Sequence, residues 1–227
     1  MLMVLVAMLA AYLIGSTPMG FIFVKVFSGR DIRQVGSGRT GGTNAMRAAG
    51  YGAGLLTALF DALKGATGVW LAKAIVPGDW QVWAMTLAGL CAILGHNYSI
   101  YLKFKGGAGG GPCVGAAIAI WPWSAAIIIP IGAVVFFGVG YASMTTLSVG
   151  VTVTALFTYR YITHRPGAEA EFIFYGIGSI ILLVWALRPN IKRLLRGEEP
   201  GVSWRAKRMK QAQAASGSGE GGGNGEG

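Results

Sequence analysis

Residues 2–23 read LMVLVAMLAAYLIGSTPMGFIF, a stretch with no charged side chain. About 20 predominantly apolar residues in a helix cross the hydrocarbon core of a bilayer, so this stretch predicts a membrane-spanning helix. It has neither a basic segment in front nor an Ala-x-Ala cleavage pattern. We therefore expect a retained span and not a signal peptide.

Similar apolar stretches recur along the chain of 227 residues, which is 53% hydrophobic and only 12% charged. That composition excludes a disordered protein and differs from an average soluble domain, in which roughly 25% of residues are charged. Four further single spans are expected at residues 55–76, 82–102, 141–161 and 172–187. Residues 112–140 exceed one span and contain Pro122 and Pro130, so they predict two short or kinked helices. We expect an all-α integral membrane protein with about seven transmembrane helices and glycine-rich cytoplasmic loops.

Charge is distributed unevenly along the chain. Lys and Arg number 19 against 9 Asp and Glu, a formal net charge of +10. Most of these cations lie in residues 25–47, in residues 103–105 or after residue 187, and the positive-inside rule assigns such segments to the cytoplasm. With seven spans in the cell membrane, the N-terminus is expected outside. The anionic partner is then membrane lipid or a phosphorylated substrate, and nucleic acid is not expected.

Two regions are expected from the change in composition near residue 200. Residues 1–199 contain all the apolar stretches and form the membrane domain. Residues 200–227 are first basic and then rich in Gly and Ser, a composition typical of a flexible, disordered tail.

Residues 35–47, VGSGRTGGTNAMR, combine closely spaced glycines with hydroxyl, amide and guanidinium groups. Such glycines let consecutive backbone N–H groups converge on an anion. Ser37 and Thr43 add hydroxyl donors, and Arg47 adds a forked cationic donor. We expect a phosphate site, but not nucleotide hydrolysis, because the loop does not follow the Walker A pattern. The alternative is a flexible connector whose arginines hold lipid headgroups.

Residues 104–112, FKGGAGGGP, form a second glycine-rich loop with Lys105 near its start. Five glycines carry an entropic cost that a simple connector has no reason to bear, so we expect a second cradle for an anion; a loose hairpin is the alternative. His96 is expected to orient this loop or to move protons. Asp61 and Lys64 predict an i,i+3 ion pair. With only His96 and His164 as histidines, we expect no metal site and no cofactor.

Several motifs resemble the bacterial acyl-phosphate:glycerol-3-phosphate acyltransferase family over about residues 12–199. In chain order they are YLIGSTPMG at 12–20, DIRQVGSG at 31–38, GGTN at 41–44 with Arg47, LGH at 94–96, LKFKGG at 102–107 and NIKRLLRGEE at 190–199. The resemblance implies a seven-helix membrane enzyme in which these motifs converge on the cytoplasmic side. It also implies transfer of an acyl chain from acyl phosphate to the hydroxyl of glycerol 3-phosphate, giving 1-acyl-glycerol 3-phosphate and phosphate in phospholipid synthesis.

The same resemblance implies the residues of the site. Those implied for catalysis are Ser37, Arg47, Lys105 and His96. Those implied for substrate binding are Gly38, Gly41, Gly42, Thr43, Asn44, Gly106, Gly107, Arg188, Asn190 and Glu199. The loop from Ser37 to Thr43 would hold the phosphoryl group of the donor, whereas Arg47, Lys105 and Asn190 would bind the acceptor. The donor's own phosphate is the first candidate to accept the proton and His96 the second, since the loops contain no other obvious base.

Three positions depart from the family pattern. Leu187 stands where the third motif usually has His, Ala108 where the second usually has another Lys, and Arg39 where the first commonly has Asn. The usual His would contact the acceptor, so a divergent paralogue that acylates another polyol phosphate is one alternative. An anion transporter, built on glycine-broken helices with cationic mouths, is the other.

Overall fold

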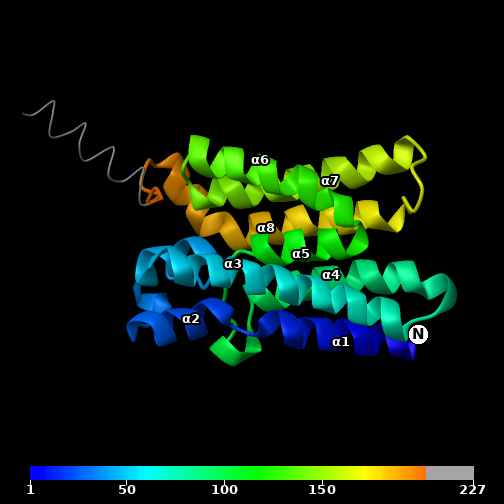
Figure 1. Ribbon diagram of the computed structural model, residues 1–227, viewed down its shortest axis with the longest axis horizontal. Coiled ribbons are helices and arrows are strands. Elements are labelled where there is room, and N and C mark those ends of the chain that lie inside the picture. Colours follow the sequence, from blue (N-terminus) through cyan, green and yellow to red (C-terminus); the bar gives the residue numbers. More distant parts are fainter. Residues whose placement is uncertain (203–227) are drawn as a thin grey trace, which may run out of the picture.

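The computed structural model describes residues 1–202, and within them the chain forms eight α-helices and no strand. The all-α prediction is therefore confirmed. The helices are α1 (Leu2–Ser16), α2 (Met19–Ser28), α3 (Gly42–Ile75), α4 (Gln81–Asn97), α5 (Gly110–Ile120), α6 (Ala125–Gly138), α7 (Ala142–Ile162) and α8 (Glu171–Leu195). They run along the long axis of the molecule (Figure 1). The expected tail at 200–227 lies, from residue 203 onward, outside the described residues.

The first expected span, residues 2–23, consists of two helices. α1 ends at Ser16 and α2 begins at Met19, because Pro18 has no N–H with which to continue the helical ladder. The carbonyl of Thr17 instead accepts a hydrogen bond from Lys64 Nζ at 2.9 Å. Together the two helices remain long and apolar enough to cross a membrane.

Four segments meet the length and apolarity of a membrane span: α1 with α2, α3, α7 and α8. Helix α8 continues through Pro189 to Leu195, beyond the expected end at residue 187. Helix α4 ends at Asn97, short of the expected residue 102, and a 3-10 turn follows at Ile100–Leu102. Helices α5 and α6 are shorter and are separated at Trp121 and Pro122, as the two-helix prediction for residues 112–140 expected. A total of seven spans stays a prediction.

The N-terminal turns of α3 fold back on the rest of the same helix. Helical geometry is interrupted at Ala49 and at Gly50, where φ is +85°, a value that favours glycine. On the N-terminal side of this break, Gly42 lies against Gly54 and Ala58, so close that a Cβ at position 42 would press on them. The first glycine loop therefore enters the helix beside residues 54–58.

Helix α3 packs closely on α5 through small residues. A Cβ on Gly65 would overlap the backbone of Pro112, and a Cβ on Gly115 would overlap the backbone of Ala62. Small residues at a helix interface let two backbones approach closely, as in membrane helix pairs. This packing places the start of α5, with Gly111 against Asp61, next to the first glycine loop.

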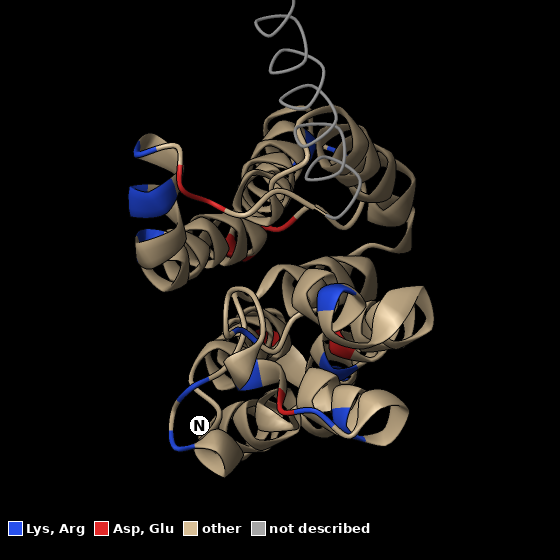
Figure 2. Cartoon of the chain, turned by 90° about the vertical axis from the view of Figure 1, so that its left-hand side faces the viewer, with Lys and Arg blue, Asp and Glu red and all other residues tan. Residues whose placement is uncertain are grey.

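The sequence motifs meet toward one end of the molecule, on the left in Figure 1, where α2 ends, α3 begins and α8 ends. Figure 2 views this end directly and shows Lys and Arg positions, in blue, on several segments of the backbone. The cations that cluster along the sequence therefore also gather at this end of the structure.

Candidate active site

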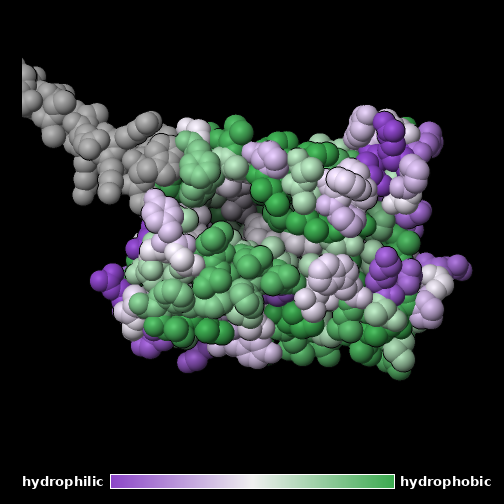
Figure 3. Space-filling view, viewed as in Figure 1, coloured by the Kyte–Doolittle hydropathy of each residue, from purple (hydrophilic) through white to green (hydrophobic). Residues whose placement is uncertain are grey.

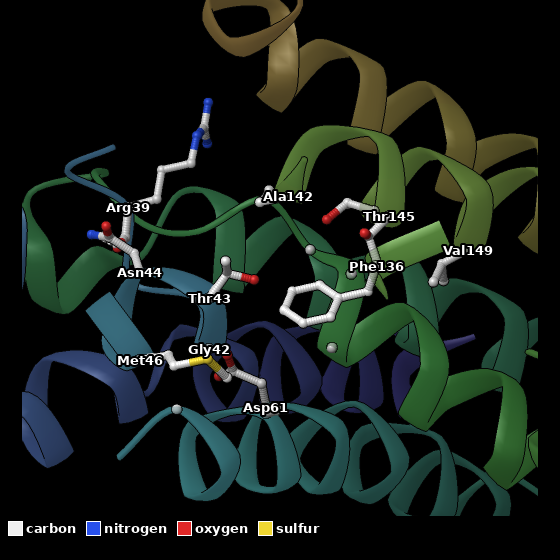
Figure 4. Close-up of a pocket in the computed structure, with 18 of the residues that line it drawn as sticks. Arg39, Gly42, Thr43, Asn44, Met46, Asp61, Phe136, Ala142, Thr145 and Val149 are labelled. Carbon is white, nitrogen blue, oxygen red and sulfur yellow. Dashed lines mark hydrogen bonds between the residues drawn. The ribbon is translucent and has the colours of Figure 1, made fainter. Parts of the chain in front are cut away.

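A cavity of about 850 Å³ lies between α3, α5, α6 and α7. Its apolar wall includes Leu55, Leu59, Val114, Ile129 and Phe136. The motif residues that line its polar end are Ser37, Arg39, Gly41, Gly42, Thr43, Asn44, Arg47, His96, Asn190 and Glu199. Figure 4 shows the side chains of Thr43 and Phe136 directed toward one another, and Figure 3 shows a hollow with hydrophobic residues around it. The first cavity therefore joins an apolar wall to a polar end.

A second cavity, of about 690 Å³, lies beside the first and is cationic. The basic residues that line it are Arg39, Lys105, Arg188, Lys192 and Arg193. No Asp or Glu in residues 1–202 lines it. Ser37, Arg39 and Asn190 line both cavities. Two groups bound in the two cavities would therefore meet beside these three residues.

The first glycine loop is shaped by the buried side chain of Asn44. Its Nδ2 donates to the carbonyls of Ile32, Val35 and Arg39 at 3.2, 2.9 and 2.9 Å, while its Oδ1 accepts from the Ser37 N–H at 3.2 Å. Gly38 supports the curvature with φ of +71°. Since the amide of Asn44 is occupied within the loop, it holds the loop in position.

Two helices begin at the polar end of the first cavity. Helix α3 starts at Gly42 and α5 starts at Gly110, and both glycines line the cavity. The first N–H groups of a helix have no partner inside the helix, and the helix dipole makes this end favourable for an anion. The glycines expected to cradle anions are therefore combined with two helix N-termini.

The second glycine loop lies directly on His96. The Gly107 N–H donates to the His96 carbonyl at 2.9 Å, and a Cβ on Gly106 or Gly107 would overlap His96. These two glycines therefore permit close packing of the loop on His96, and the expected role of His96 in orienting the loop stays a prediction. Lys105 is exposed and lines the second cavity. Arg188 is also exposed, with its guanidinium carbon 3.3 Å from the centre of the Trp185 ring.

The expected pair of Asp61 and Lys64 is confirmed, with 2.8 Å between Oδ1 and Nζ. His96 from α4 joins this pair, with its Nδ1 3.5 Å from the same carboxylate oxygen. All three side chains are buried, and Asp61 and His96 line the first cavity. Sequence spacing could not reveal the third member, because α3 and α4 meet only through tertiary packing.

Arg39 joins three segments at the boundary of the two cavities. Its Nε donates to Asn190 Oδ1 at 2.9 Å, its Nη1 donates to the Gly107 carbonyl at 2.8 Å, and its Nη2 donates to the Ala186 carbonyl. Burial is the main cause that lowers the pKa of Arg39, and the nearby cation of Arg193 lowers it further. The prediction of site residues missed Arg39, although its departure from the family pattern was a visible signal.

Residues 197–202, here called the C-terminal strap, close part of the polar end. Glu199 accepts from Asn190 Nδ2 at 3.1 Å and from the Ser143 hydroxyl. Arg47 Nη2 donates to the carbonyls of Pro200 and Gly201 at 2.9 and 3.1 Å. Arg47 and Glu199, both implied as site residues, thus hold the strap in this structure, and Asn190 links it to Arg39.

Comparison with known proteins identifies the family of the chain. A family model described as glycerol-3-phosphate acyltransferase matches residues 5–197. Relatives named glycerol-3-phosphate acyltransferase include one from Thermus thermophilus, 38% identical with 88% of this chain and 96% of the relative covered, and one from Gloeobacter violaceus, 36% identical with 85% and 92% covered.

Two crystal structures of the integral membrane glycerol 3-phosphate acyltransferase PlsY are also similar. The glycerol 3-phosphate form has a TM-score of 0.76 at 30% identity, and the lysophosphatidic acid form has a TM-score of 0.72 at 28% identity. Each match covers 87% of this chain and 94% of the other. The chain therefore belongs to the glycerol-3-phosphate acyltransferase family of integral membrane enzymes.

Proposed function

We propose that this acyltransferase moves an acyl chain from acyl phosphate to the hydroxyl of glycerol 3-phosphate, with 1-acyl-glycerol 3-phosphate and phosphate as products. The observation that carries the proposal is the junction of an apolar cavity with a cationic cavity at Ser37, Arg39 and Asn190. The reaction brings together one amphiphilic donor and one small anionic acceptor, and the two cavities match these two chemistries.

The donor is assigned to the first cavity. Its acyl chain lies along the apolar wall of Leu55, Leu59 and Phe136, an environment similar to the lipid from which the chain comes. Its phosphoryl group lies at the starts of α3 and α5, where backbone N–H groups and the hydroxyls of Ser37 and Thr43 neutralise the charge.

The acceptor is assigned to the second cavity. Lys105 and Arg188 are available there as cations for the phosphate of glycerol 3-phosphate. The hydroxyl of the acceptor then points toward Asn190 and Ser37, where the second cavity meets the first. Arg47 and Glu199 contribute indirectly, because they keep the strap and Asn190 in place.

Acyl phosphate is a mixed anhydride with a good leaving group, so positioning and charge neutralisation suffice for transfer. The acceptor hydroxyl oxygen bonds to the acyl carbon, the bond from that carbon to the phosphate oxygen breaks, and the electron pair leaves with phosphate. The hydroxyl proton passes to the departing phosphate. His96 is the second candidate for the base, but its Nδ1 faces Asp61 and its other edge faces Gly107.

The proposed topology has seven spans, with α1 and α2 counted as one and with α4, α5 and α6 each crossing. The two glycine loops then face the cytoplasm, as the positive-inside rule favours for segments rich in Lys and Arg. Single cysteines introduced at Ser28 and at Thr163 of a variant lacking Cys91 and Cys113 test this topology in intact cells. A membrane-impermeant thiol reagent should label position 163 alone.

The activity is tested with purified chain in lipid vesicles supplied with acyl phosphate and radiolabelled glycerol 3-phosphate. Labelled 1-acyl-glycerol 3-phosphate is expected, and Lys105→Ala should reduce its formation. Exposed Lys73 is outside both cavities and offers a matched control, Lys73→Ala, which should retain activity. Absence of transfer by folded wild-type chain contradicts the proposal.

Leu187 favours a second candidate, acylation of another polyol phosphate. It is buried and lines the first cavity, three residues before Asn190, which lines both cavities. The family resemblance implies a histidine at this position that contacts the acceptor. A panel of polyol phosphates assayed with wild type and with Leu187→His decides between the acceptors. Use of glycerol 3-phosphate only by Leu187→His would favour the second candidate.

A further inference from the structure

Arg39 lies where the two cavities meet and contacts three segments that are distant in sequence. Its guanidinium group donates to Asn190, to the Gly107 carbonyl and to the Ala186 carbonyl. A guanidinium group has five N–H donors. After these three bonds, one N–H remains on each terminal nitrogen, in a side chain that lines both cavities.

Among the described residues, 1–202, the charge of Arg39 has no carboxylate partner within ion-pair distance. None of the ion pairs within residues 1–202 includes it, and its three hydrogen-bond acceptors are neutral. The carboxylate of Glu199 is held instead by Ser143 and Asn190. A partly buried cation that is held in a fixed orientation by neutral acceptors, and that keeps free donors, is arranged to bind an anion.

The two carbonyls that orient Arg39 also adjoin the other positions at which the chain departs from the family pattern. Gly107 precedes Ala108, and Ala186 precedes Leu187. Ala108 and Leu187 line the first cavity together with Arg39. Neither has a charge, so neither repels Arg39 nor competes with it for an anion.

We propose that Arg39 binds a substrate phosphate at the junction of the cavities and supplies, as one fixed cation, the charge that Ala108 and Leu187 do not provide. This inference rests on the proposed function. The phosphate comes from the donor or from the acceptor, and the Michaelis constants of the two substrates distinguish these sources.

The charge is removed with least change of shape by Arg39→Gln, which keeps a donor and an acceptor. The value of kcat/KM should fall about 10- to 100-fold, as expected for loss of hydrogen bonds to a charged group. A rise in KM for acyl phosphate identifies the donor, and a rise in KM for glycerol 3-phosphate identifies the acceptor. The control is Arg165→Gln, which removes a cation outside both cavities and should leave activity unchanged. Unchanged kcat/KM for both substrates in Arg39→Gln overturns the inference.

A second measurement does not depend on turnover. Inorganic phosphate, a product of the proposed reaction, should raise the thermal unfolding temperature of wild type, because a ligand that binds only the folded state stabilises it. The shift should be absent in Arg39→Gln and retained in Arg165→Gln. An equal shift in wild type and Arg39→Gln overturns the inference even where both are active, whereas an inactive wild type overturns the proposed function instead.

Rescue separates charge from structural support. Arg39→Asn should lose activity. Addition of Ala108→Lys should raise the activity of that variant at least about 10-fold, because the new lysine supplies a cation in the same cavity and the effects of coupled sites are not additive. A lysine at 108 restores a cation but cannot rebuild the three bonds made by Arg39. If Arg39→Gln does not fold, this double variant and Arg39→Lys provide the test. Failure of both charged variants to bind phosphate contradicts the proposed charge role.

Discussion

The buried ion cluster of Asp61, Lys64 and His96 leads to a quantitative prediction for Asp61→Asn. The side chains of Asp61 and Lys64 are each 4% exposed and are 2.8 Å apart between Oδ1 and Nζ. The substitution preserves volume but leaves the ammonium group of Lys64 buried without a carboxylate partner, facing only neutral acceptors such as the Thr17 carbonyl. Removal of one partner from a buried pair costs about 3–5 kcal/mol, so the free energy of unfolding should fall by that amount.

The exposed pair of Asp31 and Arg33 provides the matched control. Their side chains are 23% and 42% exposed and are 2.7 Å apart between Oδ2 and Nη2, and exposed pairs contribute about 0.2–1 kcal/mol. Asp31→Asn should therefore change the free energy of unfolding far less than Asp61→Asn does.

Equilibrium unfolding in detergent micelles measures both variants under the same conditions. The double variant Asp61→Leu with Lys64→Met removes both charges, and it should be more stable than Asp61→Asn because no uncompensated ion remains. A loss below about 1 kcal/mol for Asp61→Asn, equal to that of the exposed pair, would refute the assignment of a buried ion cluster.

The remaining predictions concern packing, the first loop and pH. Gly115→Leu should cost about 1–3 kcal/mol in unfolding free energy through overpacking of α5 on α3, while Gly138→Ala, at an open position, should not be destabilising. Asn44→Ala removes four hydrogen bonds and should speed amide hydrogen exchange in residues 32–41 and lower kcat. The Arg33 side chain holds the pKa of Asp31 below its usual range. The stability contributed by this pair is therefore present above the usual carboxyl pKa and lost as pH falls through the lowered value, and the difference in unfolding temperature between wild type and Asp31→Asn should vanish at acid pH.

The sequence was sufficient for features that arise from local composition. The apolar stretches predicted the helices, and the spacing of Asp61 and Lys64 predicted their pair. The prolines between residues 112 and 140 predicted the separation of α5 from α6. These features depend on residues that are near one another in the chain, so their physical causes are visible in a linear pattern.

Features that depend on packing between distant segments were not visible in that way. Pro18 was a visible signal for the break between α1 and α2. The hydrogen bond from Lys64 to the Thr17 carbonyl at this break was not visible, because it forms only where α3 packs beside the end of α1. The long start of α3 escaped prediction because glycine-rich residues 41–50 look like a loop. The apolar cavity arises only when α3, α5, α6 and α7 surround the same space. The central place of Arg39 also requires α8, which supplies Ala186 and Asn190.

The most direct test of the account is a structure of the chain with a non-hydrolysable acyl phosphonate and glycerol 3-phosphate. We expect the acyl chain along Leu55 and Phe136, the phosphonate at the starts of α3 and α5, and the phosphate of the acceptor near Lys105. The acceptor hydroxyl should face the acyl carbon beside Ser37. A phosphonate bound away from both helix starts, or an acyl chain lying outside the first cavity, would contradict the account.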